Sequence, residues 1–232
     1  MSSFCKSIVM NIKITKEEHE FLQKHVIETS IIGSHLYGLE TEESDKDFLC
    51  IYRKPLEWQL IHGLPNIHQL QYDDEEANID YIYTEESQYL KNLQSGDSTI
   101  NSDLILFGNE FSTEQKLQLC RTFKVIKAYI GFANRDLKTV HRDNKKYNHI
   151  VRGLFTAEAL MDNHVITIEE LHKVINEKIN TTELRKKYVE LRVRLTKMHD
   201  DNELNMYYIP KVQDTLFQKI LDSNNIKEFK YD

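Results

Sequence analysis

The sequence has little glycine, proline or cysteine. It contains 7 Gly, 3 Pro and 3 Cys among 232 residues, so it lacks the composition of linkers and low-complexity segments. No repeated block that would indicate a solenoid occurs along the sequence. Cys5, Cys50 and Cys120 lie far apart, and no Cys-x-x-Cys pair occurs. Because disulfide frameworks and zinc sites need paired or closely spaced cysteines, the sequence predicts neither. Each cysteine is expected to be a small core residue.

Long apolar runs and an excess of positive charge are also missing. No stretch approaches the roughly 18 apolar residues of a membrane-spanning helix, and the start "MSSFCKSIVMNIKITKEEHE" has no apolar segment of secretory length. We therefore expect a cytoplasmic globular protein with no membrane partner. The net charge of −7 opposes non-specific binding to nucleic acid, although basic residues gather between Arg135 and Arg152.

The hydrophobic pattern predicts an α+β protein, and 40% hydrophobic residues can supply its core. A capping signal at Thr15 predicts a first helix over residues 15–25. Short β-branched or alternating segments predict strands at 26–32, 45–54, 67–74 and 77–84. The acidic turn between the last two strands is typical of a hairpin.

Helical patterns dominate the second half of the chain. We expect helices at residues 85–94, 112–134, 143–162, 167–178, 181–200 and 211–222. The polar segment "SGDSTINSD" is expected to separate the first of these from the rest. The predicted organisation is an α/β domain over residues 1–108 and a helical domain over residues 109–232.

A glycine and a serine directly follow the apolar strand in "IIGSHLYGLETEESDKD". Gly33 lets the backbone approach a ligand closely, and Ser34 adds a hydroxyl donor. Free amides at a helix start attract anions. The turn therefore predicts a phosphate-binding segment, and Gly38 is expected to end its short helix.

Two carboxylates follow at the start of the next strand. Asp45 and Asp47 are two residues apart, so their side chains are expected on one face. Two like charges held close together are costly unless a cation neutralises them, and Mg²⁺ bound by carboxylates and phosphates does so. The apolar residues from Phe48 to Ile51 would hold the pair rigidly, as two-metal phosphoryl chemistry requires.

The combination Gly-Ser-x-x-Tyr-Gly with Ser-Asp-x-Asp resembles the signature of the DNA polymerase β type nucleotidyltransferase superfamily. Within it, the longer form is similar to the nucleotidyltransferases associated with RNA repair in bacteria and phages. The resemblance covers roughly residues 28–175. It implies a small mixed sheet of the polymerase β palm type with a C-terminal helical domain, and two Mg²⁺ ions, with Mn²⁺ as a substitute.

The superfamily uses a third carboxylate on a neighbouring strand, and the resemblance assigns this role to Asp80 in "ANIDYIYTEES". Asp73 and Asp74 are rivals, although they belong to a run of four acidic residues that is typical of a solvated turn. The catalytic and metal-binding set implied by the resemblance is Asp45, Asp47 and Asp80.

A second match lies in the helical half, where "KKYNHIVRG" resembles the Lys-x-x-His-x-x-Arg helix of the family. It implies that Lys146, His149 and Arg152, spaced by three, bind the nucleotide together with Gly33 and Ser34. An exposed helix face explains the same spacing, so that alternative stays open. The family's Glu-Leu-Leu-Phe segment is replaced by "SDLILF", where Asp103 is only a loose substitute for the glutamate.

The resemblance implies transfer of a nucleoside monophosphate from ATP or another nucleoside triphosphate to a hydroxyl, with release of pyrophosphate. The implied acceptor is an RNA 3′ end, such as that of a tRNA. Two alternatives remain: nucleotidylation of a protein or small molecule, and a non-catalytic nucleotide-binding module. The spacing of Arg135 and His141 also fits the Arg-x5-His pattern of helical ribonuclease domains.

Overall fold

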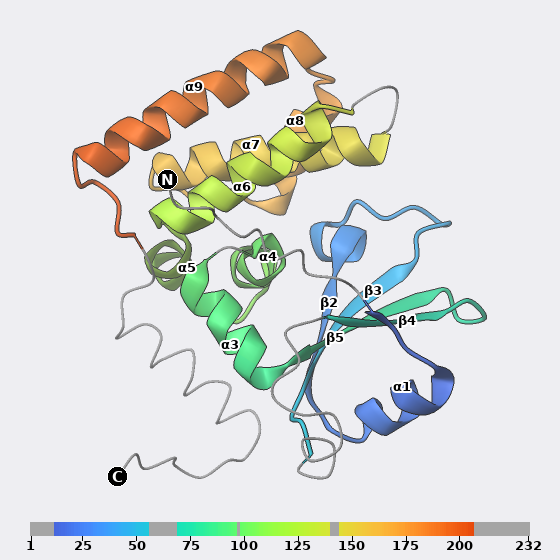
Figure 1. Cartoon of the computed structure of the whole chain (residues 1–232). Helices are drawn as coiled ribbons and strands as arrows, with labels where there is room; N and C mark the ends of the chain where they lie inside the picture. The colour runs from blue at the N-terminus through green and yellow to red at the C-terminus, as the bar shows by residue number, and fades with distance from the viewer. Residues whose placement is uncertain (1–11, 56–68, 97, 140–143, 207–232) are drawn as a thin grey trace, which may run out of the picture. The chain divides into compact units, whose positions relative to one another are not determined.

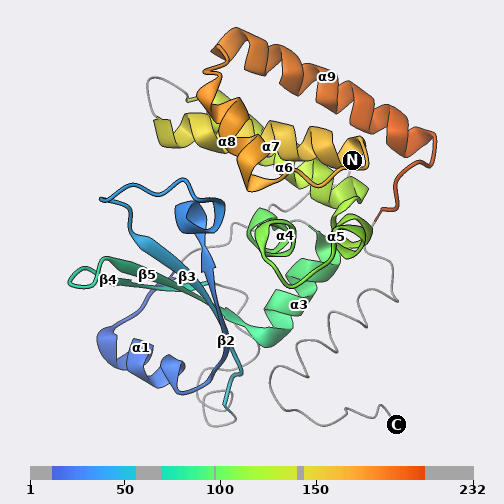
Figure 2. The same ribbon diagram turned by 180° about the vertical axis from the view of Figure 1, so that it is seen from behind.

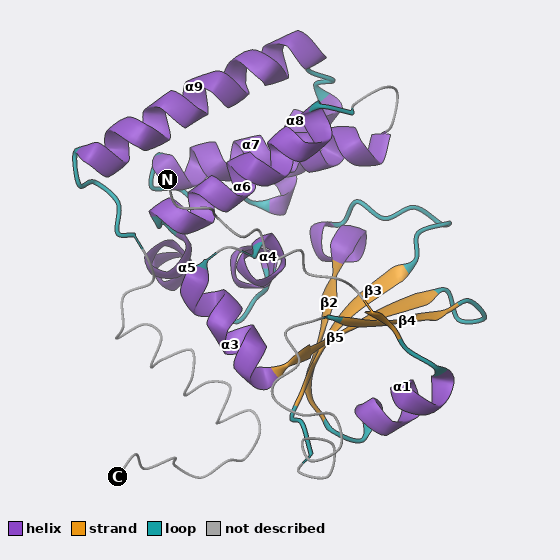
Figure 3. Cartoon of the chain, in the orientation of Figure 1, coloured by secondary structure: helices purple, strands orange, loops and turns teal. Residues whose placement is uncertain are grey.

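The computed structural model describes residues 12–55, 69–96, 98–139 and 144–206. They divide into two compact units. The sheet unit comprises the described residues up to Leu36 together with Glu40–Lys91, and the helical unit comprises Tyr37–Leu39 and the described residues from Asn92 onward. The expected α+β class is confirmed (Figures 1 and 3). The last division between the two units lies after Lys91, and the domain boundary expected after residue 108 stays a prediction.

The sheet unit contains a five-stranded mixed sheet in the order β1-β4-β5-β3-β2. Its strands are β1 (Ile12–Lys13), β2 (Val26–Ile32), β3 (Lys46–Tyr52), β4 (Leu70–Asp74) and β5 (Ile79–Glu85). The pairs β1–β4 and β3–β5 are parallel, whereas β4–β5 and β2–β3 are antiparallel. The predicted β4–β5 hairpin is confirmed, and the β3–β5 pairing is the contact on which the candidate site depends.

One face of this sheet packs against helix α1 (Lys16–Gln23), as Figure 3 shows. The helix begins with a capping box between Thr15 and Glu18. Leu22 is fully buried and joins a core with Cys50, Tyr83 and other residues of the sheet. Because strand side chains alternate, the residues on either side of Cys50 face away from α1.

A 3-10 helix, η1 (Gly33–Tyr37), follows β2 directly. Gly33 has a φ of +69°, and Gly38 has a φ of +63°. Glycine adopts these left-handed conformations without the strain that a Cβ would introduce. The expected end of the short helix at Gly38 is therefore confirmed.

Helix α3 (Glu86–Ser95) continues from β5, and the helical unit follows it along the chain. Figure 2 shows its helices from behind. They are α4 (Thr99–Phe107), α5 (Thr113–Cys120), α6 (Phe123–Leu137), α7 (Asn144–Met161), α8 (Ile168–Asn176) and α9 (Thr181–Asp200). Helices α6, α7 and α9 pack against one another. Val125, Leu154 and Leu191 are among the apolar side chains buried in this unit.

Two helix predictions were wrong in detail. The helix expected over residues 112–134 is interrupted at Arg121, because Thr122 caps a new helix by accepting a hydrogen bond from the Val125 amide. The expected break over residues 95–103 is shorter, because α4 already begins at Thr99. Its polar residues 101–103 are buried, so polarity here did not indicate a loop. The helix expected at 211–222 lies outside the described residues.

The described cysteines, Cys50 and Cys120, are buried free thiols, as expected of core residues; Cys5 lies outside the described part of the chain. Burial raises the pKa of Cys50 to about 11 and that of Cys120 further. Both thiols therefore stay protonated and unreactive near neutral pH. Among the residues described, none of the helices combines the length and apolarity that crossing a bilayer requires.

Candidate functional site

Three carboxylates predicted from the sequence come together at one end of β3 and β5. Asp47 lies opposite Asp80 in the parallel register of these strands, and Asp45 precedes β3. Each of the three residues offers a carboxylate oxygen within 4.8 Å of the others, and all three are partly buried. Three hard oxygen ligands at this spacing suit a divalent cation such as Mg²⁺ or Mn²⁺.

Local hydrogen bonds fix the chain at this end of the sheet. A turn is closed by the Thr41 amide, which donates to Oγ of Ser44 at 2.9 Å, and by the Ser44 amide, which donates to the Thr41 carbonyl at 3.0 Å. The amide of Lys46 then donates to the Asn78 carbonyl at 3.1 Å. Asp45 therefore lies between two anchored positions, beside the start of β5.

The two rival carboxylates have other partners. Asp73 also lies opposite Asp80, in the antiparallel β4–β5 register, but it accepts hydrogen bonds from Lys13 Nζ at 2.5 Å and from Gln71 at 2.7 Å. The Lys13 contact lowers the pKa of Asp73. Asp74 accepts a hydrogen bond from the Ala77 amide at 3.1 Å in the hairpin turn. Among the described residues, Asp80 is the candidate whose carboxylate oxygen lies within 4.8 Å of those of Asp45 and Asp47, so the geometry favours Asp80 as the third carboxylate.

Gly33 lies directly against the acidic cluster. A Cβ built on Gly33 would lie only 2.1 Å from Oδ2 of Asp47. Glycine is therefore required here by the close approach to a carboxylate as well as by the positive φ. Ser34, the next residue, is partly buried in η1. The structure thus brings the predicted phosphate-binding turn next to the predicted metal ligands.

We expect Gly33→Ala to displace the Asp47 carboxylate and to weaken Mn²⁺ binding at least about tenfold, with a loss of about 1–3 kcal/mol in the free energy of unfolding. Isothermal titration and chemical denaturation measure the two effects. Gly38→Ala is the matched control: its φ is also positive, but the nearest atoms to its Cβ would be those of the His172 ring, from 3.4 Å, and of Ile168, at 3.8 Å, which are ordinary van der Waals contacts. Equal Mn²⁺ affinities for the two variants would contradict the assigned role of Gly33.

Lys146, His149 and Arg152 lie on α7 in the helical unit. Arg152 is buried, and its Nη1 donates a hydrogen bond to Oδ2 of Asp103 at 2.5 Å. Burial opposes the charge of this guanidinium, but the adjacent Asp103 outweighs it and raises the pKa of Arg152. Its contact with a nucleotide stays a prediction, while its contact with Asp103 is visible in the structure.

His149 is held by a carboxylate on α6, and its Nδ1 lies 3.0 Å from Oδ2 of Asp136. Burial lowers the pKa of His149, and the hydrogen bond to Asp136 only partly opposes this effect. The neutral ring therefore donates from Nδ1 and leaves Nε2 as an acceptor.

Lys146 is partly buried. Arg135 also binds Asp136, at 3.0 Å, and His141 lies outside the described residues.

Sequence reasoning missed the buried partners of Arg152. Tyr37 is buried, and its hydroxyl donates a hydrogen bond to Asp103 at 2.7 Å. Tyr129 donates to the other oxygen of the same carboxylate at 2.6 Å. No motif marks Tyr129, and the polar sequence around Asp103 is typical of a loop. The apolar sequence "LILF" directly after Asp103 was the one local signal that this aspartate is buried.

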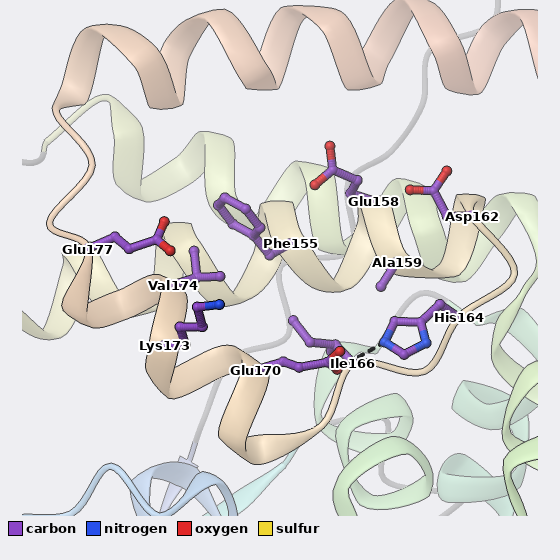
Figure 4. A pocket seen from close by; sticks show the side chains of 10 residues that line it. All are labelled: Phe155, Glu158, Ala159, Asp162, His164, Ile166, Glu170, Lys173, Val174 and Glu177. Carbon is purple, nitrogen blue, oxygen red and sulfur yellow. Dashed lines mark hydrogen bonds and ion pairs between the residues drawn. The ribbon is translucent and has the colours of Figure 1, made fainter.

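A cavity of about 330 Å³ lies between α7 and α8 in the helical unit (Figure 4). Its lining includes the carboxylates Glu158, Asp162, Glu170 and Glu177. Ion pairs with α9 hold two of them, Lys187 with Glu158 and Arg194 with Asp162, and Glu170 binds His164. Lys173 is the lysine of this lining, and the carboxylates outnumber it, so the cavity offers a triphosphate little positive charge and is a poor candidate for the nucleotide site.

The match to a protein family covers nearly the whole chain. The model of RlaP, the RNA repair pathway DNA polymerase beta family, matches residues 6–224. These residues contain the acidic cluster, the Gly33–Ser34 turn and the α7 residues described above. No curated protein matches the chain. The extent of the family match, together with the mixed sheet and its three carboxylates, shows that the chain belongs to the RNA repair pathway DNA polymerase beta family.

Proposed function

We propose that the protein is a divalent-metal-dependent nucleotidyltransferase that adds a nucleoside monophosphate to an RNA 3′ hydroxyl. The observation that carries the proposal is the meeting of Asp45, Asp47 and Asp80 beside Gly33. Family membership supports both the reaction class and the RNA repair context. The tRNA-like acceptor rests on that context alone.

The three carboxylates fit a pair of Mg²⁺ or Mn²⁺ ions. They are hard oxygen donors, they are partly buried, and they lie on or beside the paired strands β3 and β5. When bound, the metal would offset the charge of the triphosphate and lower the pKa of the acceptor hydroxyl. Asp45, Asp47 and Asp80 would hold the metal, and Asp80 is proposed to help activate the acceptor hydroxyl.

The remaining roles follow from the chemistry of each side chain. The Gly33 backbone and the Ser34 hydroxyl are proposed to hold the β- and γ-phosphates, so that the α-phosphorus is presented for in-line attack and pyrophosphate leaves. Lys146 is proposed to balance the charge of the triphosphate. Because the neutral His149 ring leaves Nε2 as an acceptor, we propose that it receives a hydrogen bond from a ribose or acceptor hydroxyl.

The first experiment supplies purified protein with Mg²⁺, each α-labelled nucleoside triphosphate and total tRNA. Matched tRNA with a periodate-oxidised 3′ end is the acceptor control, and Asp45→Asn/Asp47→Asn is the enzyme control. We expect label on the intact tRNA only, with at least about 100-fold less transfer by the double variant. A parallel reaction contains lysate protein, because the net charge of −7 favours an acceptor other than long RNA.

The result separates the reaction classes. Label on protein would replace the RNA acceptor by a protein hydroxyl, as in a modifying enzyme. Metal-dependent triphosphate binding without transfer to either acceptor would favour a nucleotide-binding module. Equal labelling of the intact tRNA and of the tRNA with an oxidised 3′ end would contradict attack by the terminal hydroxyl.

A further inference from the structure

A buried cluster in the helical unit is centred on Asp103 of α4. Its Oδ2 accepts hydrogen bonds from the Tyr37 hydroxyl at 2.7 Å and from Nη1 of Arg152 at 2.5 Å. Its Oδ1 accepts a hydrogen bond from the Tyr129 hydroxyl at 2.6 Å. Asp103 is 1% exposed and Arg152 is 5% exposed. The carboxylate is thus neutralised and held by three donors from three separate segments of the chain.

Tyr37 is held through three different parts of the residue. Its hydroxyl binds Asp103, and its ring lies beneath the guanidinium of Arg152, with the guanidinium carbon 4.5 Å from the ring centroid. The ring also meets the edge of Phe107, with the centroids 5.2 Å apart. Its carbonyl accepts a hydrogen bond from Nε2 of His172 on α8 at 2.8 Å. These contacts fix both the side chain and the backbone of Tyr37.

Tyr37 is also the last residue of η1, the 3-10 helix that begins at Gly33. The chain passes from the sheet unit to the helical unit within this helix, because Leu36 belongs to the first unit and Tyr37 to the second. Only three residues, 34–36, lie between Gly33 and the anchored Tyr37 in this short helix. Few backbone torsions therefore separate the two positions. At that other end, no room exists between Gly33 and the Asp47 carboxylate for even a Cβ.

We propose that Tyr37 is a positioning residue for the phosphate-binding turn. Held by Asp103 and Arg152, it fixes the end of η1 and thereby the place of the Gly33 and Ser34 backbone beside Asp47. In this arrangement Arg152 affects nucleotide binding by holding Tyr37, and it does not contact a phosphate. The consequence for nucleotide affinity rests on the proposed function, whereas the fixing of the turn does not.

The cluster contains its own matched control. Tyr37→Phe and Tyr129→Phe each remove one hydroxyl that binds Asp103, and each leaves the aromatic ring in place. Tyr129 lies on α6 and is not joined to the turn. A purely structural role of the cluster predicts similar effects of the two variants, because each removes one buried hydrogen bond to the same carboxylate.

Two readouts test the proposal on the full chain. Amide hydrogen exchange of peptides covering Gly33–Tyr37 is expected to be faster in Tyr37→Phe than in Tyr129→Phe. Equilibrium binding of ATP with Mg²⁺ is expected to weaken about five- to tenfold in Tyr37→Phe and less than about twofold in Tyr129→Phe. Where transfer is measured, the Tyr37→Phe effect should be larger on KM than on kcat.

Each outcome decides the proposal. Equal exchange in η1 for the two variants overturns it, whatever the nucleotide affinities are. Faster exchange in Tyr37→Phe with unchanged ATP affinity overturns the link between the turn and the phosphates. If the unaltered protein binds none of the four nucleoside triphosphates with Mg²⁺, the proposed function fails, and the exchange result alone still supports or overturns the fixing of the turn by Tyr37.

Discussion

Asp80→Asn is expected to lower the rate of nucleotidyl transfer by about 10²- to 10³-fold and to weaken Mn²⁺ binding. Asparagine keeps the shape of the side chain but removes the negative charge from a cluster whose carboxylate oxygens lie within 4.8 Å of one another. The parallel β3–β5 register that pairs Asp80 with Asp47 does not require that charge. Single-turnover kinetics and titration with Mn²⁺ measure the two effects.

Asp73→Asn is the control for this prediction. Asp73 on β4 is paired directly with Asp80 on β5 in the antiparallel register. Both carboxylates therefore belong to the same face of the sheet. Lys13 already binds Asp73, and we expect transfer by Asp73→Asn within about threefold of the unaltered protein. A larger loss with Asp73→Asn than with Asp80→Asn would move the third carboxylate from β5 to β4.

Asp103→Ala is expected to lower the free energy of unfolding by about 3–5 kcal/mol, because it leaves the buried guanidinium of Arg152 without its carboxylate. Both side chains are almost fully buried. The two tyrosine hydroxyls that bind Asp103 lose their acceptor as well. Chemical denaturation followed by circular dichroism measures the effect.

The double variant Asp103→Leu/Arg152→Met is expected to regain most of the lost stability, since an apolar pair of similar volume leaves no buried charge. Restored stability with weakened ATP binding would also agree with the positioning role of Tyr37. The contrary result is an Asp103→Ala variant as stable as the unaltered protein. That outcome would show that Arg152 does not depend on Asp103 and would revive its direct contact with phosphates.

The elements nearest the acidic cluster were predictable because their signals are local. The strand Val26–Ile32 and the short helix that Gly38 ends both follow from β-branched residues and glycine positions. Asp80 was ranked above Asp73 and Asp74 by a family resemblance and by the apolar residues around it. Hydrophobic alternation placed Asp80 and Ile82 on one face, which the register with Asp47 and Leu49 confirms.

The failures have a common cause in tertiary contacts. Asp103 lies in a polar segment that was expected to break the helices, yet α4 passes through it because distant residues satisfy its carboxylate. The spacing of Lys146, His149 and Arg152 predicted one functional stripe. The partners that α4 and α6 provide for Arg152 and His149 cannot be read from that spacing. The spacing of residues in the sequence indicates which side chains share a face of a helix or strand. It contains no information about which distant side chain packs against that face.

By itself, the sequence predicted the chemistry proposed for one end of the sheet. A glycine-serine turn and an Asp-x-Asp pair predict metal-dependent phosphoryl transfer because these residue types suit phosphates and hard cations, and the family resemblance added the third aspartate. Only the tertiary structure decided the pairing of Asp47 with Asp80, the neutralisation of Asp73 by Lys13 and the burial of Arg152 against Asp103. Each of these joins residues far apart in the chain, and their contact depends on strand register and helix packing, which no local propensity specifies.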